Sequence, residues 1–483
     1  MEAVGPDVAQ SVVLDRPPIC EPADRGFILA AAVLASSMGF IDSSVTAVAL
    51  PAIRTSLSAS LEAAQWISGA YLLTLSSLVL IGGAMSDRFG IARMFGGGIV
   101  AFVLFSLACA AAQDAGQMIA ARALQGMAAG VMVPGSMAIV SRAYPRAERG
   151  RALGLWAAAS TATTAAGPIF GGLLLSFGGA EAWRLIFALN LPLGIIAVVL
   201  LRRYALPDAG QRNTPLDIVG AGLAIMGLGL IAGGLIDEGR AGLLLAASGA
   251  VVFAGFLAWE SKTPHPMIRL AMFRNPAFVA ANLATFLLWF AITGVGFYLP
   301  MTAISAWGRN EIEMALALLP TSVLIAALSA PVGRLADRIG PFIPMALGAL
   351  IVTIAQIGMI MVAQDAAFWA EVFPLIVLSG FGIALVAAPL TIAVMAEASE
   401  AEQGAASGIN NAIARAATLV AVALLGRIAA AGYGEVEPGF GLPSASPAHV
   451  AATGVAFGHL VIAATVAALA SAVVSALQIR RRR

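Results

Sequence analysis

The sequence predicts an all-α, polytopic membrane protein with fourteen transmembrane helices. Three observations lead to this fold class. About 60% of the 483 residues are apolar and 11% are charged, with a mean hydropathy of +0.92, which is more apolar surface than a water-soluble core can hold. Apolar runs long enough to cross a bilayer recur along the chain, and a short charged motif occurs twice. Most of the protein is therefore expected to lie in hydrocarbon.

The apolar runs are about 19 to 25 residues long, which is the length of helix that crosses roughly 30 Å of hydrocarbon. Each run is expected to form one membrane-spanning helix. The runs fall at residues 27–50, 63–84, 94–112, 116–140, 153–176, 184–202, 217–236, 241–259, 277–303, 312–333, 342–363, 370–396, 406–427 and 453–477.

The repeated motif indicates that the chain is built from two related halves. Its copies at 83–90 and 333–340 share Gly, Asp, Arg and Gly at the same four positions, and each follows an apolar run. Duplicated helical halves are typical of secondary transporters, whose substrate site lies between the halves near the middle of the membrane. The copies follow runs 2 and 10, whereas two six-helix halves would place the second copy after run 8. Two additional helices are therefore expected between the halves.

The expected organisation has five parts. The first residues hold acids and prolines without an apolar core, which is unlike a signal peptide. The parts are a disordered cytoplasmic tail at 1–26, an N-terminal six-helix bundle at 27–203, two additional helices with linkers at 204–276, a C-terminal six-helix bundle at 277–478 and a basic cytoplasmic tail at 479–483.

The distribution of basic residues predicts the orientation. With the N-terminus inside, twenty of the 27 Lys and Arg residues fall in inner segments and five in outer loops, and Arg122 and Arg415 lie within spans. Because basic residues accumulate on the cytoplasmic side, both termini are expected in the cytoplasm. We expect a multi-pass monomer in a bacterial inner membrane, and the net charge of +1 argues against nucleic acid as a partner.

The remaining composition argues against an enzyme. Cys20 and Cys109 form no metal or disulfide pattern, and His265, His449 and His459 are scattered. No G-x-x-x-x-G-K-[ST] loop occurs. No cofactor or metal is expected.

Each copy of the motif is expected to reverse the chain at the cytoplasmic face. Gly83 and Gly90 permit a tight turn, while Asp87 can cap the following helix or pair with a neighbouring arginine. Such an ion pair would hold a cytoplasmic gate shut. The alternative is an ordinary capped turn between two helices. The presence of the motif at matching positions in both halves favours the gate over this alternative. The expected gate residues are Gly83, Asp87, Arg88, Gly90, Arg93, Gly333, Asp337, Arg338 and Gly340.

The motif resembles the cytoplasmic signature of the major facilitator superfamily, and further segments resemble its fourteen-helix drug:proton antiporter family of multidrug exporters. The similarity runs along essentially the whole chain and implies a major facilitator fold with two six-helix bundles and two additional helices. The segments are 42–51, Gln65-Trp66 with Tyr71-Leu72-Leu73, Arg122 with Gln125-Gly126, Gly167-Pro168 with Gly171-Gly172, Trp183-Arg184 with Phe187, Asn190, Pro192 and Gly194, and Asp217 with Gly220.

Three departures from the family pattern indicate a divergent branch. Ile91-Ala92 stands where basic residues usually follow the first motif, and 416–418 lacks the common glycines. The segment 298–300 lacks a glutamine often found a few residues on. The identity of the cargo therefore cannot be inferred from that of well-studied relatives.

Asp42 and Arg122 are the expected proton-coupling residues. A charge inside the membrane costs about 2.5 to 3.5 kcal/mol on insertion scales, so one that is present is a functional candidate. At 1.5 Å per residue, both side chains fall about 8 to 9 Å from the outer edge, and the two can meet. Burial and the arginine act in opposite directions on the carboxyl group, so a change in their separation would load and release a proton. The alternative is a structural ion pair.

Other candidates have functional and structural interpretations side by side. Gly167, Pro168, Gly171 and Gly172 form either a hinge in the fifth span or a close-packing patch, and in the resembled family this segment distinguishes exporters from importers.

Arg415 lies on one helical face with Asn411 and either faces cargo or pairs with the acids Glu397 and Glu400. The aromatic and amide candidates either line the substrate cavity or pack and anchor the helices. They are Trp66, Tyr71, Gln125, Trp289 and Tyr298.

The predicted function is proton-coupled export of small amphiphilic compounds, such as drugs or toxic metabolites, by alternating access. The partners are the amphiphile, protons and the lipid bilayer. The alternatives are export of an endogenous lipid-like or anionic metabolite and uncoupled facilitated transport of a small solute.

Overall fold

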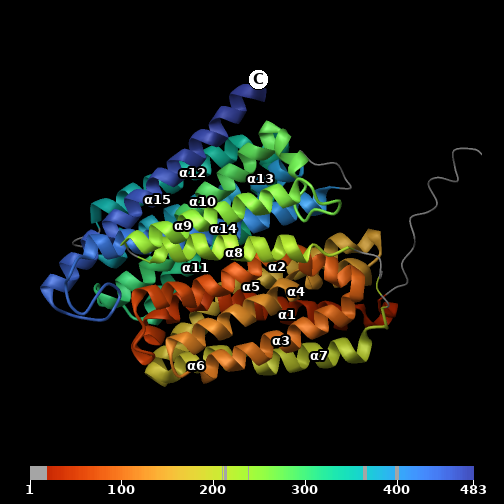
Figure 1. The fold of residues 1–483 in the computed structure, drawn as a ribbon, viewed down its shortest axis with the longest axis horizontal. Coiled ribbons are helices and arrows are strands. Elements are labelled where there is room, and N and C mark those ends of the chain that lie inside the picture. Colours follow the sequence, from red (N-terminus) through yellow and green to blue (C-terminus); the bar gives the residue numbers. More distant parts are fainter. Residues whose placement is uncertain are drawn as a thin grey trace, which may run out of the picture.

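The computed structural model describes residues 19–208, 210, 215–237, 239–362, 367–396 and 402–482. These residues form a bundle of α-helices (Figure 1). The α-helices are α1 (Arg25–Ser56), α2 (Leu61–Phe89), α3 (Ile91–Ala111), α4 (Ala115–Ala143), α5 (Arg146–Gly178), α6 (Trp183–Ala188), α7 (Asn190–Tyr204), α8 (Ile218–Ile236), α9 (Gly239–Glu260), α10 (Pro276–Ser305), α11 (Glu311–Ile339), α12 (Phe342–Val362), α13 (Phe373–Met395), α14 (Gln403–Tyr433) and α15 (Pro447–Arg482).

The membrane-spanning helices match the predicted runs. Within the described residues, thirteen helices are long and apolar enough to cross a membrane, and α2, bent by 54° beyond Val79, makes a fourteenth when its two parts count as one span. The helices α6 and α7 together form one of these spans. Several helices extend beyond the apolar runs, among them α1, α5 and α15. Polar side chains cap the first turns of three others. Ser60, Asp114 and Asn310 each accept a hydrogen bond from a backbone N–H of the first turn.

The spans pack into two groups joined by a helix pair. Helices α1 to α7 pack on one another, with α4 lying along α2 and α3, and α1 along α5 and α7. Helices α10 to α15 form the second group, in which α15 lies along α10 and α12. In Figure 1 the first group is red to yellow and most of the second is blue-green to blue. The additional pair, α8 and α9, lies at the junction, where α8 contacts α2 and α14.

The two ends of the bundle differ in how the groups meet. We call the end where α1 begins and α15 finishes the terminal end, and the opposite one the far end. At the far end one continuous apolar core includes Leu50 of α1, Tyr298 of α10 and Leu425 of α14. A separate core around Phe95 and Met132 lies within the first group. The two groups are therefore packed together at the far end.

Part of the expected disordered tail belongs to the fold. Residues 1–18 lie outside the described residues, but Ile19 and Cys20 are buried and the Ile19 carbonyl accepts a hydrogen bond from Leu206 N–H. These apolar side chains extend the core of the first group, which explains their order. At the other terminus, α15 continues to Arg482, so residues 479–482 are helical instead of forming a tail.

Candidate functional site

Asp42 and Arg122 form a buried ion pair in the first group of helices. The Arg122 Nη1 atom lies 2.5 Å from Asp42 Oδ2, and the residues are 2% and 1% exposed. Asp42 lies in the middle of α1 and Arg122 in the first half of α4, which runs in the opposite direction. The contact agrees with the depth calculated from the sequence. The role of the pair in proton coupling stays a prediction.

Gln125 completes the cluster from one turn further along α4. Its Nε2 donates to Asp42 Oδ1 at 3.0 Å, and its Oε1 accepts from Arg122 Nη1 at 2.7 Å. Both carboxylate oxygens of Asp42 thus have a donor. Arg122 Nε donates to the Ile67 carbonyl, so the cluster also joins α2. Gln125 was expected to line the substrate cavity, and it belongs instead to the ion-pair cluster.

An aromatic ring covers the cluster. The Arg122 guanidinium carbon lies 4.3 Å from the Tyr71 ring centroid, and Tyr71 is 2% exposed. A guanidinium over an aromatic face gains a cation–π attraction that is larger when the site is desolvated. The Phe187 ring lies 5.7 Å from the same carbon. Arg122 is held between two rings and a carboxylate.

The cluster compensates the buried carboxylate of Asp42. Arg122 and Gln125 replace its hydration, so the charged groups are tolerated away from water. The ion pair also fixes α1 against α4.

Close backbone contacts of glycines bring α2 and α4 together below the cluster. A Cβ atom on Gly126 would lie 2.4 Å from the Tyr71 carbonyl oxygen, and one on Gly82 would lie 2.1 Å from the Gly130 carbonyl oxygen. Small residues let membrane helices approach closely. The sequence alone did not indicate this α2–α4 contact.

Gly82→Ala is expected to destabilise the protein, whereas Gly83→Ala is not. The new methyl group at position 82 overlaps Gly130, and overpacking of this kind costs about 1 to 3 kcal/mol. A Cβ at position 83 meets nothing within 4 Å, and alanine is the better helix former. Thermal unfolding of both variants in detergent checks this. Equal losses at the two positions would contradict it.

The predicted gate residues lie in the terminal-side parts of α2 and α11, in the turns that follow them, and, for Arg93, in the first turn of α3. Gly90 and Gly340 have φ of +97° and +86° and close their helices in the same way, as expected for a turn. Gly83 lies inside α2, so it does not form part of the reversal. Gly333 likewise lies inside α11, about two turns before its end. Arg93, Asp337 and Arg338 are exposed.

The cap on α3 comes from outside the motif. We expected Asp87 either to cap the following helix or to pair with a neighbouring arginine. Asp87 and Arg88 belong to the last turn of α2, and the first of these two roles is not seen for Asp87. The Ile91 N–H instead donates to Asp208 Oδ2 at 2.9 Å, and Arg142 Nη1 of α4 lies 2.8 Å from the same oxygen. Asp208 belongs to the segment after α7. Three parts of the chain, α3, α4 and this segment, therefore meet at one carboxylate.

The pKa of Asp208 lies below its ordinary value. Burial raises it, but the Ile91 N–H, the Arg142 charge and the Gly210 N–H lower it by a larger amount. The carboxylate form is therefore the one that holds the turn.

Asp208→Asn is expected to lower the free energy of unfolding by about 1 to 3 kcal/mol, because it removes a charged acceptor. A lowered pKa means that this contribution is fully present above the unfolded pKa and is lost as the pH falls through the folded pKa. The difference from wild type should be constant between pH 5 and pH 8 and fade below about pH 4. Unfolding temperatures across this range check it, with the exposed Asp237→Asn as control. Identical curves at pH 7 would contradict it.

The glycines of α5 form a tight seam against two other helices. A Cβ on Gly171 would lie 2.0 Å from Val45 of α1, and one on Gly172 would lie 2.8 Å from the Glu311 carbonyl of α11. Gly167 has a similar contact with Ser44. Pro168 lies inside α5, which is continuous. In this structure the segment is a packing seam that joins the two groups.

Arg415 and Asn411 lie on α14 and face the first group. Arg415 Nε donates to Asn411 Oδ1 at 3.0 Å, and Asn411 is exposed. The helix α14 packs on α2, which carries Tyr71. The alternative partners Glu397 and Glu400 lie outside the described residues.

The remaining aromatic candidates are packing residues. Tyr298 is fully buried, and its hydroxyl donates to the Val422 carbonyl at 2.5 Å while accepting from Gln65. This contact joins α10, α14 and α2 at the far end. Trp66 packs on α8, where a Cβ atom added to Gly233 would lie 3.3 Å from the Trp66 ring. Trp289 is half-buried at the edge of the far-end core.

An acid pair fixes the additional helices, which the sequence did not indicate. Asp217 Oδ1 accepts from the Gly220 N–H and from Trp259 Nε1, so it caps α8 and binds α9. Glu260, at the end of α9, is 3% exposed and accepts from the Ile268 N–H at 2.7 Å. The pair connects α8, α9 and the linker to α10.

Comparison with known proteins agrees with this architecture. The model of the Major Facilitator Superfamily matches residues 32–422. The Methylenomycin A resistance protein of Bacillus subtilis is 30% identical over 83% of this chain and 87% of its own length. The Tetracenomycin C resistance and export protein of Streptomyces glaucescens is 31% identical over 85% of this chain and 77% of its own.

Among solved structures, a bacterial homolog of the human lysosomal transporter Spinster, in an inward-facing and unoccupied conformation, has a TM-score of 0.71 and 18% identity. The match covers 95% of this chain and 97% of that one. This likeness concerns the fold alone. With the sequence relatives and the matched family model, it leads to one conclusion: the chain is a membrane transporter that belongs to the major facilitator superfamily.

Proposed function

We propose that this transporter exports small amphiphilic compounds in exchange for protons by alternating access. The observation that carries the proposal is the Asp42–Arg122–Gln125 cluster. It places an acid and its counter-ion inside the membrane-spanning part of the protein, with 1 to 2% exposure. A charge so placed is expensive and is a functional candidate by default.

The proton is exchanged at Asp42. In the arrangement described, Arg122 and Gln125 compensate the carboxylate. When α1 and α4 shift, this compensation is lost and the acid takes up a proton from the opposite side. Tyr71 of α2 covers the cluster, and α14 packs on α2, so we expect cargo bound between the groups to lie within reach of this exchange.

The far-end contacts support one state of the cycle. Gln65 and Tyr298 join three helices there, and Gly172 abuts Glu311. With the terminal end in the cytoplasm of a bacterial cell, as the basic residues predict, the closed far end makes this the inward-facing state. Export then requires these contacts to open and the terminal end to close.

The driving force is sufficient. One charge crossing a potential of about 150 mV supplies about 3.5 kcal/mol, which corresponds to several hundredfold accumulation. One proton per cargo molecule is enough for useful export.

Antibiotic-resistance relatives support an amphiphilic cargo. The two relatives described above are named for methylenomycin A and tetracenomycin C. Two intramembrane arginines against one acid favour an anionic or zwitterionic amphiphile over a dication. Export of an endogenous lipid-like or anionic metabolite is the related alternative.

A test is proton release from purified protein in detergent on addition of cationic, neutral and anionic amphiphiles, with Asp42→Asn as control. Release by the wild type and none by the variant is expected. An uncoupled facilitator is the second candidate, favoured by the complete pairing of Asp42. It would give no release and would transport equally well after the pH gradient collapses.

A further inference from the structure

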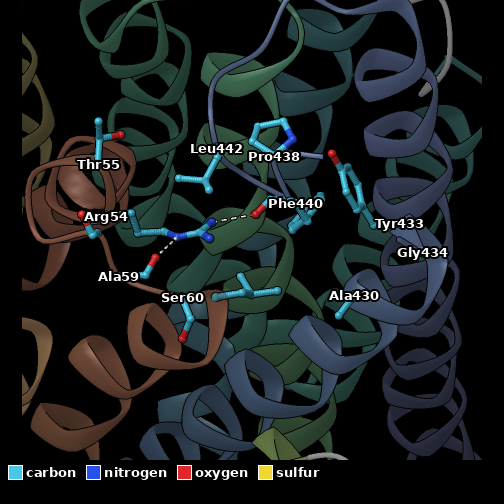
Figure 2. A pocket seen from close by; sticks show the side chains of 13 residues that line it. Arg54, Thr55, Ala59, Ser60, Ala430, Tyr433, Gly434, Pro438, Phe440 and Leu442 are labelled. Carbon is cyan, nitrogen blue, oxygen red and sulfur yellow. Dashed lines mark hydrogen bonds between the residues drawn. The ribbon is translucent and has the colours of Figure 1, made fainter. Parts of the chain in front are cut away.

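A cavity of about 620 Å³ lies at the far end, apart from the Asp42 cluster. The end of α1, the turn before α2, the end of α14 and the loop after α14 surround it (Figure 2). Its volume is in the range of small-molecule sites, which is about 300 to 1,000 Å³. The sequence did not indicate it, because α1 continues well past the predicted run.

Arg54 supplies a buried positive charge to this cavity. The residue is 2% exposed. Figure 2 shows its guanidinium reaching from α1 toward the loop, where Nη1 donates to the Phe440 carbonyl at 2.6 Å and Nε to the Ala59 carbonyl at 3.3 Å. Among the described residues, no carboxylate lies within 4.0 Å of Arg54. Its acceptors are neutral carbonyl oxygens.

A buried guanidinium with only neutral acceptors attracts an anion. Carbonyl dipoles replace part of its hydration but leave its charge uncompensated. A carboxylate matches the planar fork of a guanidinium and forms charge-assisted hydrogen bonds with it. The described residues that line the cavity include no acid, so the site disfavours cations.

The rest of the lining suits an amphiphile. Ser58 and Ser60 contribute hydroxyl groups near the charge, whereas Leu61, Phe440 and Leu442 contribute apolar surface. The lining therefore combines a positive charge and hydroxyl groups with apolar surface. A molecule with an acidic group on an apolar body matches both.

The loop over the cavity rests directly on the arginine. Gly441 has φ of +78°, and a Cβ there would lie 2.8 Å from Arg54 Nη1 and 2.3 Å from Met301 Sδ. The loop backbone therefore comes close to the charge, and the Phe440 carbonyl occupies one donor. An anion at Arg54 would replace this carbonyl and release the loop.

We infer that the Arg54 cavity is a second binding site, on the release side, for the carboxylate of an anionic amphiphile. The inference rests on the proposed export function and specifies the charge of its cargo. Cargo arriving at the far end binds Arg54, displaces the Phe440 carbonyl and frees the loop through which it leaves.

The test measures the fluorescence of two matched probes, dansylglycine and its uncharged amide, titrated into the purified full-length protein in detergent. Dansylglycine is expected to bind about tenfold more tightly than the amide, as a charge-assisted hydrogen bond implies. Arg54→Gln should abolish this difference and Arg54→Lys should retain part of it. Arg309→Gln, which removes a half-exposed arginine paired with Glu313 at the same end, should leave it unchanged.

Three outcomes would overturn the inference. They are equal binding of the two probes by the wild type, an undiminished preference in Arg54→Gln, and a preference lost in Arg415→Gln but kept in Arg54→Gln. Arg54→Lys keeps the charge and is the variant to measure if Arg54→Gln does not fold. It should retain part of the preference for the carboxylate probe. Proton release by the wild type separates the two proposals: a wild type that releases no proton on cargo binding but keeps its carboxylate preference counts against antiport and leaves the Arg54 site standing.

Discussion

Asp42→Asn is expected to abolish transport driven by a pH gradient. Asparagine has nearly the same shape, and its carbonyl oxygen still accepts from Arg122, but it cannot take up or release a proton at physiological pH. The loss should therefore be of coupling and not of the fold. Flux of an amphiphile in proteoliposomes, with and without an imposed pH gradient, measures it.

Exchange of cargo without a gradient is the internal control for this variant. If cargo binding lies apart from Asp42, exchange should continue in Asp42→Asn while gradient-driven flux falls to the level of empty liposomes. Flux that still responds to the gradient as in wild type would remove Asp42 from the coupling mechanism. The buried pair would then be structural.

Arg122→Gln is expected to cause the largest loss of stability. It leaves the Asp42 carboxylate buried without its counter-ion, and breaking one side of a buried pair costs about 3 to 5 kcal/mol. The hydrogen bond to the Ile67 carbonyl and the contact with the Tyr71 ring are lost as well. Thermal unfolding in detergent measures the effect.

The double variant Asp42→Asn with Arg122→Gln is the matched control. It removes both charges and leaves neutral groups that can bond to one another, so much of the lost stability should return. A double variant as unstable as Arg122→Gln alone would show that Arg122 stabilises through its packing, and that its charge contributes little. Arg25→Gln, which removes a partly exposed arginine paired with Glu148, should have a much smaller effect.

The ion pair was predictable from the sequence because depth in a membrane helix depends on counting residues. Asp42 and Arg122 lie on antiparallel helices at similar distances from the outer edge of the membrane. In the structure, Arg122 Nη1 lies 2.5 Å from Asp42 Oδ2. Gln125, one turn from Arg122, was expected to face cargo, because the count does not show which face of α4 meets α1. Tyr298, which was also expected to line the cavity, is fully buried among α2, α10 and α14, and the role of Trp66 stays a prediction.

The gate shows a second limit of sequence reasoning. The turns at Gly90 and Gly340 were predicted, since a glycine after a charged helix end is a local signal. The carboxylate that caps α3, Asp208, lies more than a hundred residues further on. A contact between segments that are far apart in the sequence cannot be predicted from the residue spacing within either segment.

The sequence by itself determined that this protein crosses the membrane about fourteen times, that it is built from two halves with two added helices between them, and that one acid lies in the first span. These properties follow from the length and apolarity of single segments, because each helix in lipid satisfies its own backbone. Only the tertiary structure decided that Gln125 belongs to the ion pair, that α5 packs through its glycines, and that Arg54 lies buried without an acid. Those features depend on which helices are neighbours and which faces they turn to each other, and packing between distant segments settles that.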